Sequence, residues 1–153
     1  MLTVKRPEDL ADHVGEVIGV GEWLLVDQDM IDRFADLSGD DQWIHVDAER
    51  AKTEMPGGST IAHGLLTLCL SPRLSKGHLT VEELRMAVNY GINKLRFTAP
   101  APVGARLRMR SRIAAVTQRP DGAVMVATER VVEIEGAEKP AMVAETVSLL
   151  YGA

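Results

Sequence analysis

The chain has 153 residues, of which 46% are hydrophobic and 25% are charged; these values suit one globular domain and exclude a disordered tail, a collagen-like repeat and a coiled coil. No apolar run approaches the ~20 residues of a membrane span, no signal peptide is recognisable, and the single cysteine excludes an intrachain disulfide, so we expect a cytoplasmic protein. The net charge of −5 gives no electrostatic reason to expect a nucleic acid or an anionic membrane as a partner.

The first third of the chain has the pattern of short helices and loops. Pro7 suits the first turn of a helix that Gly15 can close, and residues 17–26 are typical of a strand. Asp27 can cap the next helix. The apolar residues of that helix fall on one face: Met30, Ile31, Phe34 and Leu37.

A polar loop at residues 38–42 comes next. Asp47 can then cap a short helix over residues 48–52. Residues 63–70 are apolar nearly all round, which is typical of a buried helix. On that interpretation Cys69 is an inert core residue.

The second half has the pattern of antiparallel strands. Residues 86–97 are extended, and residues 98–104 contain the prolines and glycine of a turn. Strands are then predicted over the alternating residues 106–113, over residues 124–135 and over residues 142–150. One buried helix followed by a long antiparallel sheet predicts an α+β fold in which the sheet wraps around the helix.

Charge patterning predicts the register of one hairpin. If Arg119 faces Gly122 across a proline turn, three opposite-charge pairs lie across the strands: Arg112 with Glu129, Arg108 with Glu133, and Arg106 with Glu135. Each pair contributes a few tenths of a kcal/mol. We interpret this arginine stripe as a solvated face paired with glutamates rather than a phosphate-binding surface.

Asp40 and His45 stand five residues apart in the loop after an amphipathic helix. A carboxylate and an imidazole together can hold, deprotonate and reprotonate one water molecule, as hydration and hydrolysis require. The structural alternative is that Asp40 caps a turn while His45 is a satisfied, half-buried histidine.

His63 and Gly64 open the apolar helix. The first amides of a helix have no internal partners, and a glycine there lets a substrate carbonyl approach the backbone closely. Such a donor can stabilise an enolate by roughly 3 kcal/mol. The alternative is that Gly64 only permits tight packing.

A metal site built from Asp40, His45, Asp47 and His63 is a third possibility. In an extended segment His45 and Asp47 would point to opposite sides, and the closely spaced histidine pair of zinc enzymes is absent, so we expect no metal. Lys94 and Arg96 are the better candidates for contacts with an anionic group such as a cofactor phosphate.

Three segments resemble MaoC-like, (R)-specific enoyl-CoA hydratases. They are Phe34-Ala35-Asp36-Leu37-Ser38-Gly39-Asp40 with His45, Asp47 and Ala51; Ile61-Ala62-His63-Gly64-Leu65-Leu66; and Asn89-Tyr90-Gly91-Ile92-Asn93-Lys94-Leu95-Arg96-Phe97 with Pro100 and Pro102-Val103-Gly104. The last segment is similar to the nodulation-protein-N-like subgroup. The resemblance covers about residues 11–151, and its motifs are specific in combination.

The resemblance implies a single hot-dog domain over residues 1–153 and a homodimer. It identifies Asp40 and His45 as the catalytic pair and the Gly64 amide as the oxyanion donor, with His63 beside it at the substrate. Two departures stand out. Gln42-Trp43 replaces a frequent Asn-Pro, which bears on acyl-chain fit, and Pro72 stands where family members often have a serine that assists the catalytic loop.

The implied reaction is hydration of a trans-2-enoyl-CoA to an (R)-3-hydroxyacyl-CoA, or the reverse dehydration. Coenzyme A is part of the substrate, with Lys94 and Arg96 near its phosphates, and no separate cofactor is expected. Two other functions stay open: an acyl-CoA thioesterase, and a non-catalytic subunit that binds acyl thioesters.

Overall fold

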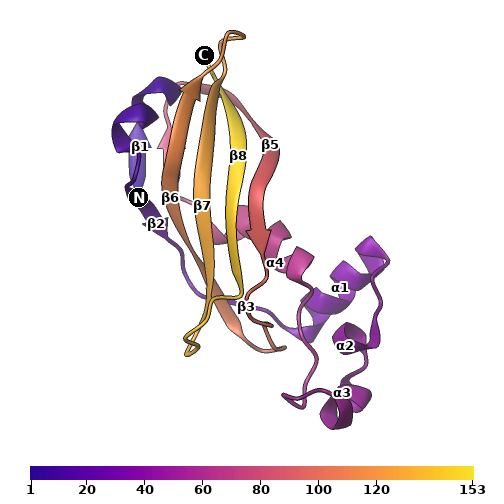
Figure 1. Ribbon diagram of the computed structural model, residues 1–153. Helices are drawn as coiled ribbons and strands as arrows, with labels where there is room; N and C mark the ends of the chain where they lie inside the picture. The colour runs from indigo at the N-terminus through magenta and orange to yellow at the C-terminus, as the bar shows by residue number, and fades with distance from the viewer.

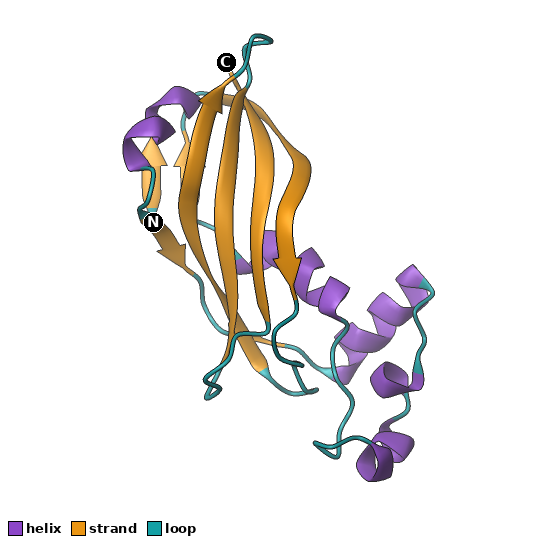
Figure 2. Cartoon of the chain, in the orientation of Figure 1, coloured by secondary structure: helices purple, strands orange, loops and turns teal.

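A curved antiparallel sheet forms the largest part of the protein, whose computed structural model describes residues 1–153 (Figures 1 and 2). Its strands are β2 (Val17–Val20), β3 (Leu24–Leu25), β5 (Leu84–Arg96), β6 (Arg106–Gln118), β7 (Val124–Ile134) and β8 (Met142–Gly152). They run in the order β2-β6-β7-β8-β5, and β3 also pairs with β6. A small parallel pair, β1 (Leu2–Val4) and β4 (Leu79–Val81), accompanies the 3-10 helix η1 (Pro7–His13).

The helices lie in two places relative to this sheet. They are α1 (Gln28–Ser38), α2 (Trp43–Val46), α3 (Ala48–Glu54), α4 (Gly64–Cys69) and α5 (Ser71–Leu74). Figure 1 shows α4 beside the lower part of β5, whereas α1, α2 and α3 project to the lower right, away from the sheet. None of these helices is long and apolar enough to cross a membrane.

The predicted charge pairing between β6 and β7 is confirmed. Arg112 faces Glu129 and Arg108 faces Glu133, while Arg106 and Glu135 form an ion pair at 3.3 Å. The predicted proline turn is also present, since the Gly122 N–H donates to the Arg119 carbonyl, but the strand partner of Arg119 is Ala123, one residue beyond Gly122. A register shift between Ile113 and Ala115 restores the predicted pairing.

Two sequence expectations are wrong in detail. The strand over residues 17–26 is two short strands, because the chain leaves the sheet near Gly21, where a side chain would collide with the Leu74 carbonyl. The apolar helix is not buried all round: Leu65 and Cys69 are exposed. Cys69 is therefore not a core residue of the single chain.

The core consists of two separate apolar clusters. The larger contains residues from α1, α4 and the lower sheet, among them Ile31, Leu66 and Met109. The smaller joins η1 to the upper sheet through residues such as Leu10 and Ile113. The larger cluster anchors the helices that carry the candidate site.

Candidate active site

The end of α1 determines where Asp40 lies. Gly39 caps the helix with φ 77°, a left-handed conformation that favours glycine, and its N–H bonds to the Ala35 carbonyl. The Ser38 hydroxyl donates to the Phe34 carbonyl and accepts the Asp40 N–H at 3.2 Å. The chain therefore turns sharply at Gly39 and presents the exposed Asp40 carboxylate directly after the helix.

His45 lies in α2, and its imidazole is buried. Its Nδ1 donates to the Ile61 carbonyl at 2.7 Å; because a carbonyl only accepts, the neutral ring carries its proton on Nδ1 and leaves Nε2 as an acceptor. The expected extended segment is therefore wrong. Asp47 does not alternate with His45 along a strand but caps α3, where it accepts from the Arg50 N–H.

Two residues that the sequence analysis missed hold this loop. The Gln28 side chain donates to the His45 carbonyl at 2.8 Å and accepts from the Thr60 hydroxyl at 2.6 Å. Thr60 is fully buried. These bonds connect positions 17 and 32 residues apart, so no local pattern in the sequence could have identified them.

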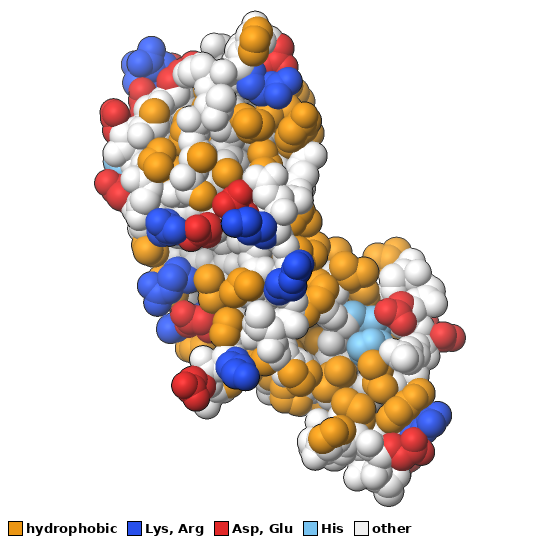
Figure 3. Space-filling view, viewed as in Figure 1, with side chains coloured by type: hydrophobic (Ala, Val, Ile, Leu, Met, Phe, Trp, Pro, Cys, Tyr) orange, Lys and Arg blue, Asp and Glu red, His pale blue; other side chains and the backbone are white.

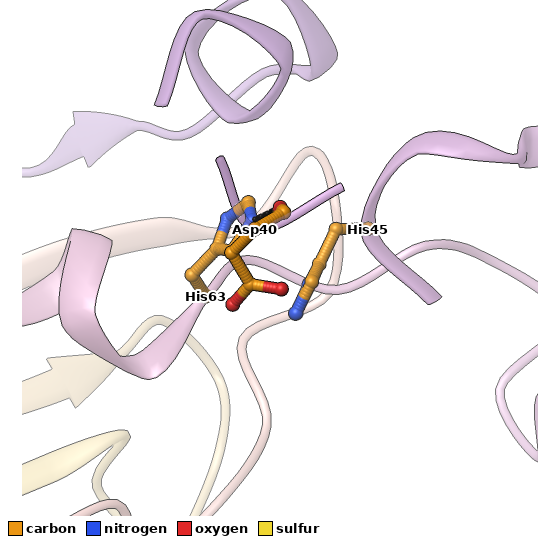
Figure 4. A group of neighbouring side chains, drawn as sticks. All are labelled: Asp40, His45 and His63. Carbon is orange, nitrogen blue, oxygen red and sulfur yellow. Dashed lines mark hydrogen bonds between the residues drawn. The ribbon is translucent and has the colours of Figure 1, made fainter. Parts of the chain in front are cut away.

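His63 is also buried beside the pair. Its Nε2 donates to the Asp40 carbonyl at 2.8 Å, and its ring stacks on His45 with centroids 3.7 Å apart. Figure 4 shows the Asp40 carboxylate in front of His63, facing the outer nitrogen of His45. His63 therefore fixes the backbone of Asp40 and the plane of His45.

The structure thus gathers three of the four metal-ligand candidates and leaves Asp47 out. One possible ligand atom from each of Asp40, His45 and His63 lies within 4.8 Å of the other two. The two imidazole planes are inclined by only 23°, so their in-plane lone pairs run side by side rather than converging on one ion. This geometry suits a water molecule between two acceptors better than a metal centre.

A cavity of about 300 Å³ opens beside His45. Its wall is mainly apolar and includes Ala62, Gly64, Thr67 and Phe97. As the first residue of α4, Gly64 has an amide without an intrahelical acceptor. In Figure 3 the histidine atoms lie in a surface surrounded largely by hydrophobic side chains.

Gly64 also satisfies a packing requirement. A Cβ built at this position would lie 2.5 Å from the Phe97 ring, closer than real side chains approach. The packing explanation of Gly64 and the oxyanion explanation are therefore compatible, because the same lack of a side chain admits both the ring and a ligand.

Lys94 and Arg96 do not line this cavity. They stand on β5 opposite Glu145 and Val143, in the wall of another groove of about 790 Å³. Neither His45 nor Gly64 contributes to that groove. Their contact with cofactor phosphates stays a prediction.

Comparison with known proteins identifies the family. The model of the MaoC-like domain matches residues 9–135. The 3-hydroxyacyl-thioester dehydratase Z of Mycobacterium tuberculosis is 46% identical over 147 residues, covering 96% of this chain and 97% of that protein. Nodulation protein N of Rhizobium leguminosarum bv. viciae is 38% identical, covering 93% and 89%. The chain belongs to the MaoC-like domain family.

Solved structures show the same fold at low identity. A MaoC-like dehydratase from Rhodospirillum rubrum superposes with a TM-score of 0.75 at 21% identity, covering 95% of this chain and 96% of that one. The (R)-hydratase of A. caviae gives a TM-score of 0.69 at 22% identity, covering 88% and 94%. The expected hot-dog fold, a sheet around a central helix, is confirmed.

Proposed function

We propose that this protein interconverts trans-2-enoyl thioesters and 3-hydroxyacyl thioesters by adding or removing water. The observation that carries the proposal is the Asp40 carboxylate facing the unprotonated nitrogen of His45, beside an apolar cavity that contains Gly64. The names of the relatives, a 3-hydroxyacyl-thioester dehydratase and an (R)-hydratase, support this class of reaction.

Substrate activation takes place at Gly64. The thioester carbonyl oxygen accepts the Gly64 N–H, which draws electron density from the double bond and makes the β-carbon electrophilic. The apolar walls from Ala62 and Phe97 surround the acyl chain and exclude bulk water. Coenzyme A is the part of the substrate that carries the acyl chain as a thioester, and Lys94 and Arg96 are proposed to contact its phosphates.

The water is held by two acceptors. One O–H donates to the Asp40 carboxylate and the other to His45 Nε2, so the oxygen lone pair is directed at the β-carbon. As the C–O bond forms, one of the two side chains takes a water proton, and a proton is delivered to the α-carbon. Hydration changes no overall oxidation level, so no redox cofactor takes part. We assign the (R) product from the family resemblance.

The partner that we propose is a second copy of this chain. β5 is an edge strand with 13 residues, and it exposes apolar side chains along its length: Leu84, Met86, Val88, Tyr90 and Ile92. Figure 3 shows hydrophobic side chains along this edge of the sheet. A long unpaired apolar edge is unfavourable in water, and pairing β5 with β5 of another protomer also brings cover to the exposed Cys69 of α4, which lines a groove beside Tyr90.

The test follows loss of the conjugated enoyl-thioester absorbance with crotonyl-CoA, while free thiol is assayed in the same tubes. Wild type is expected to lose absorbance without releasing thiol. Asp40→Asn should keep the fold and lower turnover by about 10²- to 10⁴-fold, because the carboxylate acceptor is lost. Asp41→Asn, the neighbouring exposed carboxylate, is the matched control and should keep full activity.

Other outcomes point to the two remaining functions. Thiol release from a saturated acyl-CoA would make the protein a thioesterase, in which the same water attacks the carbonyl. Thermal stabilisation by enoyl-CoA without any product would make it a binding subunit. An unchanged rate in Asp40→Asn would remove the aspartate from the mechanism.

A further inference from the structure

A polar chamber lies against the smaller apolar cluster of the core, with Ile18, Val126 and Leu150 of that cluster in its wall. This cavity, about 180 Å³, lies on the concave side of the sheet, and its polar wall consists of Ser75, His78, Ser111, Thr128, Arg130 and Ser148. Protein interiors are normally apolar at this depth, and polar groups placed there need partners. The chamber contains no carboxylate in its wall.

Arg130 is the only cation in this wall, and its charge has no counter-ion. Its Nε donates to the Thr146 hydroxyl at 2.8 Å and its Nη1 contacts the Met109 sulfur at 3.3 Å. A guanidinium has five N–H donors, so three remain without an acceptor in the chain. No carboxylate oxygen lies within the 4.0 Å that defines an ion pair.

On the opposite face of the same sheet the arginines do have carboxylate partners. There Arg108 and Arg110 both pair with Glu133, and Arg112 pairs with Glu129. These three arginines are thus paired, while the partly buried Arg130 is not. An uncompensated cation that is partly removed from water costs free energy, which an incoming anion can recover.

Two further groups in this region lack partners. His78 is 4% exposed; its Nδ1 bonds to the Ser111 hydroxyl at 2.9 Å, and its Nε2 has no hydrogen-bond partner. The buried hydroxyl of Ser71 has none either. Burial lowers the pKa of His78, and the positive charges of Arg130 and the N-terminus lower it further.

The chamber is connected to the helix that begins at the proposed oxyanion donor. A groove of about 650 Å³ between β5 and the α4–α5 segment shares Ser75 and Arg130 with the chamber, and Ser71 also lines it. Ser71 lies seven positions after Gly64, about 10 Å along an α-helix axis. An extended acyl chain spans that distance with roughly eight carbon–carbon bonds.

We propose that Arg130, with the hydroxyls around it, forms a subsite for a carboxylate at the far end of the acyl chain, so that dicarboxylic enoyl thioesters are preferred substrates. This rests on the proposed function. The free N–H groups of a guanidinium match a planar carboxylate in a bidentate arrangement. The groove wall from Leu68 and Ile92 contacts the methylene chain between the two ends.

The experiment compares two thioesters of equal length, trans-2-decenoyl-CoA and the corresponding ω-carboxylate, trans-2-decenedioyl-CoA. Wild type is expected to show the higher kcat/KM for the ω-carboxylate. In Arg130→Gln, kcat/KM for the ω-carboxylate should fall roughly 10- to 100-fold, the value of a charge-assisted hydrogen bond. The rate with crotonyl-CoA, which is too short to reach the chamber, should be unchanged.

Arg110→Gln is the matched control, because Arg110 stands on the outer face of the same sheet. A binding measurement without turnover accompanies the kinetics: sebacate, a free ten-carbon dicarboxylate, should raise the melting temperature of wild type and of Arg110→Gln but not of Arg130→Gln. If Arg130→Gln does not fold, Arg130→Lys, which keeps the charge but lacks the bidentate guanidinium, replaces it in both measurements.

Each result decides one question. Hydration of crotonyl-CoA together with equal kcat/KM for the two ten-carbon substrates would overturn the subsite and leave the proposed function intact. Equal losses for both substrates in Arg130→Gln would also overturn it, since Arg130 would then be structural only. No hydration of any thioester, with sebacate still stabilising wild type through Arg130, would retain the carboxylate site and reject the proposed function.

Discussion

Gly39 is the residue on which the position of Asp40 depends most directly. Its φ of 77° costs a residue with a side chain about 1–2 kcal/mol. Gly39→Ala should therefore lower the free energy of unfolding by about that amount and reduce kcat, because Asp40 follows immediately. Gly57 has no positive φ and nothing within 4 Å of a built Cβ, so Gly57→Ala is the control and should change neither quantity. The measurements are urea unfolding and enoyl-CoA kinetics.

Gln28 acts on the site through His45 rather than through the substrate. Gln28→Leu removes one donor to the His45 carbonyl and one acceptor for the buried Thr60 hydroxyl, which should cost about 1–3 kcal/mol. We expect kcat to fall while KM stays within a factor of a few, because the loop that holds His45 loosens and the cavity does not change. Asp32→Asn alters another side chain that is bonded to Gln28 and is the control. If Asp32→Asn lost as much kcat and thermal stability as Gln28→Leu, this role of Gln28 would be contradicted.

Gly64 and Phe97 can be separated by a double-mutant cycle. Gly64→Ala should destabilise the fold and abolish activity, because its Cβ collides with the Phe97 ring. In Gly64→Ala with Phe97→Ala the collision is gone, and stability should recover relative to the two single changes. If activity stays lost, the space in front of the Gly64 amide is needed by the substrate; full recovery of activity would show that Gly64 serves packing alone.

At the scale of single residues, sequence patterns located Asp40, His45 and Gly64 but not the groups that orient them. Asp40 follows a helix cap with a recognisable glycine, and Gly64 opens an apolar helix, so both carry local signals. The bonds from Gln28 and Thr60 connect distant segments, and their residue types are common in loops and helices. Only folding brings such partners together.

At the scale of elements, the β6–β7 hairpin was predicted because charges of opposite sign repeat at a fixed cross-strand spacing. The bulge at Ala114 was not: it moves the inward face from odd positions such as Ile113 to Val116, and the few residues beyond it are too short a stretch to establish a new alternation. The two-part strand β2–β3 was missed for a related reason: its break is imposed by contact with Leu74 and His78.

The buried His78, which packs against β2, makes the free energy of unfolding depend on pH. A Cβ at Gly19 would lie 2.5 Å from its ring, so β2 packs tightly on the imidazole. Burial, and then the charges of Arg130 and the N-terminus, lower its pKa from 6.5. The unfolded chain therefore binds the proton more strongly, and the stabilisation present above pH 6.5 is lost as the pH falls towards the folded-state pKa.

We accordingly expect the free energy of unfolding to decrease between about pH 7 and pH 5, with a smaller slope in His78→Gln. His13→Gln is the control, because His13 pairs with Glu16 near the surface rather than in the chamber. Urea unfolding at several pH values measures the slopes. A slope in His78→Gln as steep as in wild type would assign the dependence to other groups.

At the scale of the whole molecule, the exposed edge of β5 leads to a prediction about assembly. Val88→Glu places a charge in the middle of the edge that we propose to pair with a second copy, and should shift the protein to a monomer in light scattering. Val14→Glu alters an apolar side chain of similar exposure away from that edge, and should leave the mass unchanged. A wild-type protein that is monomeric at micromolar concentration would contradict the pairing.

The sequence by itself determined what depends on neighbours along the chain. Helix caps at Asp27 and Asp47, strand alternation, the charge register of one hairpin and the candidacy of Asp40 and His45 follow from short-range patterns. It also indicated the family, because those local signals occur together in a fixed order. The tertiary structure alone decided which faces are covered and which buried groups meet. Three features depend on contacts between segments distant in sequence, which a linear pattern does not contain. They are the exposure of α4 and β5, the hydrogen bond from Gln28 to the His45 carbonyl, and the uncompensated charge of Arg130.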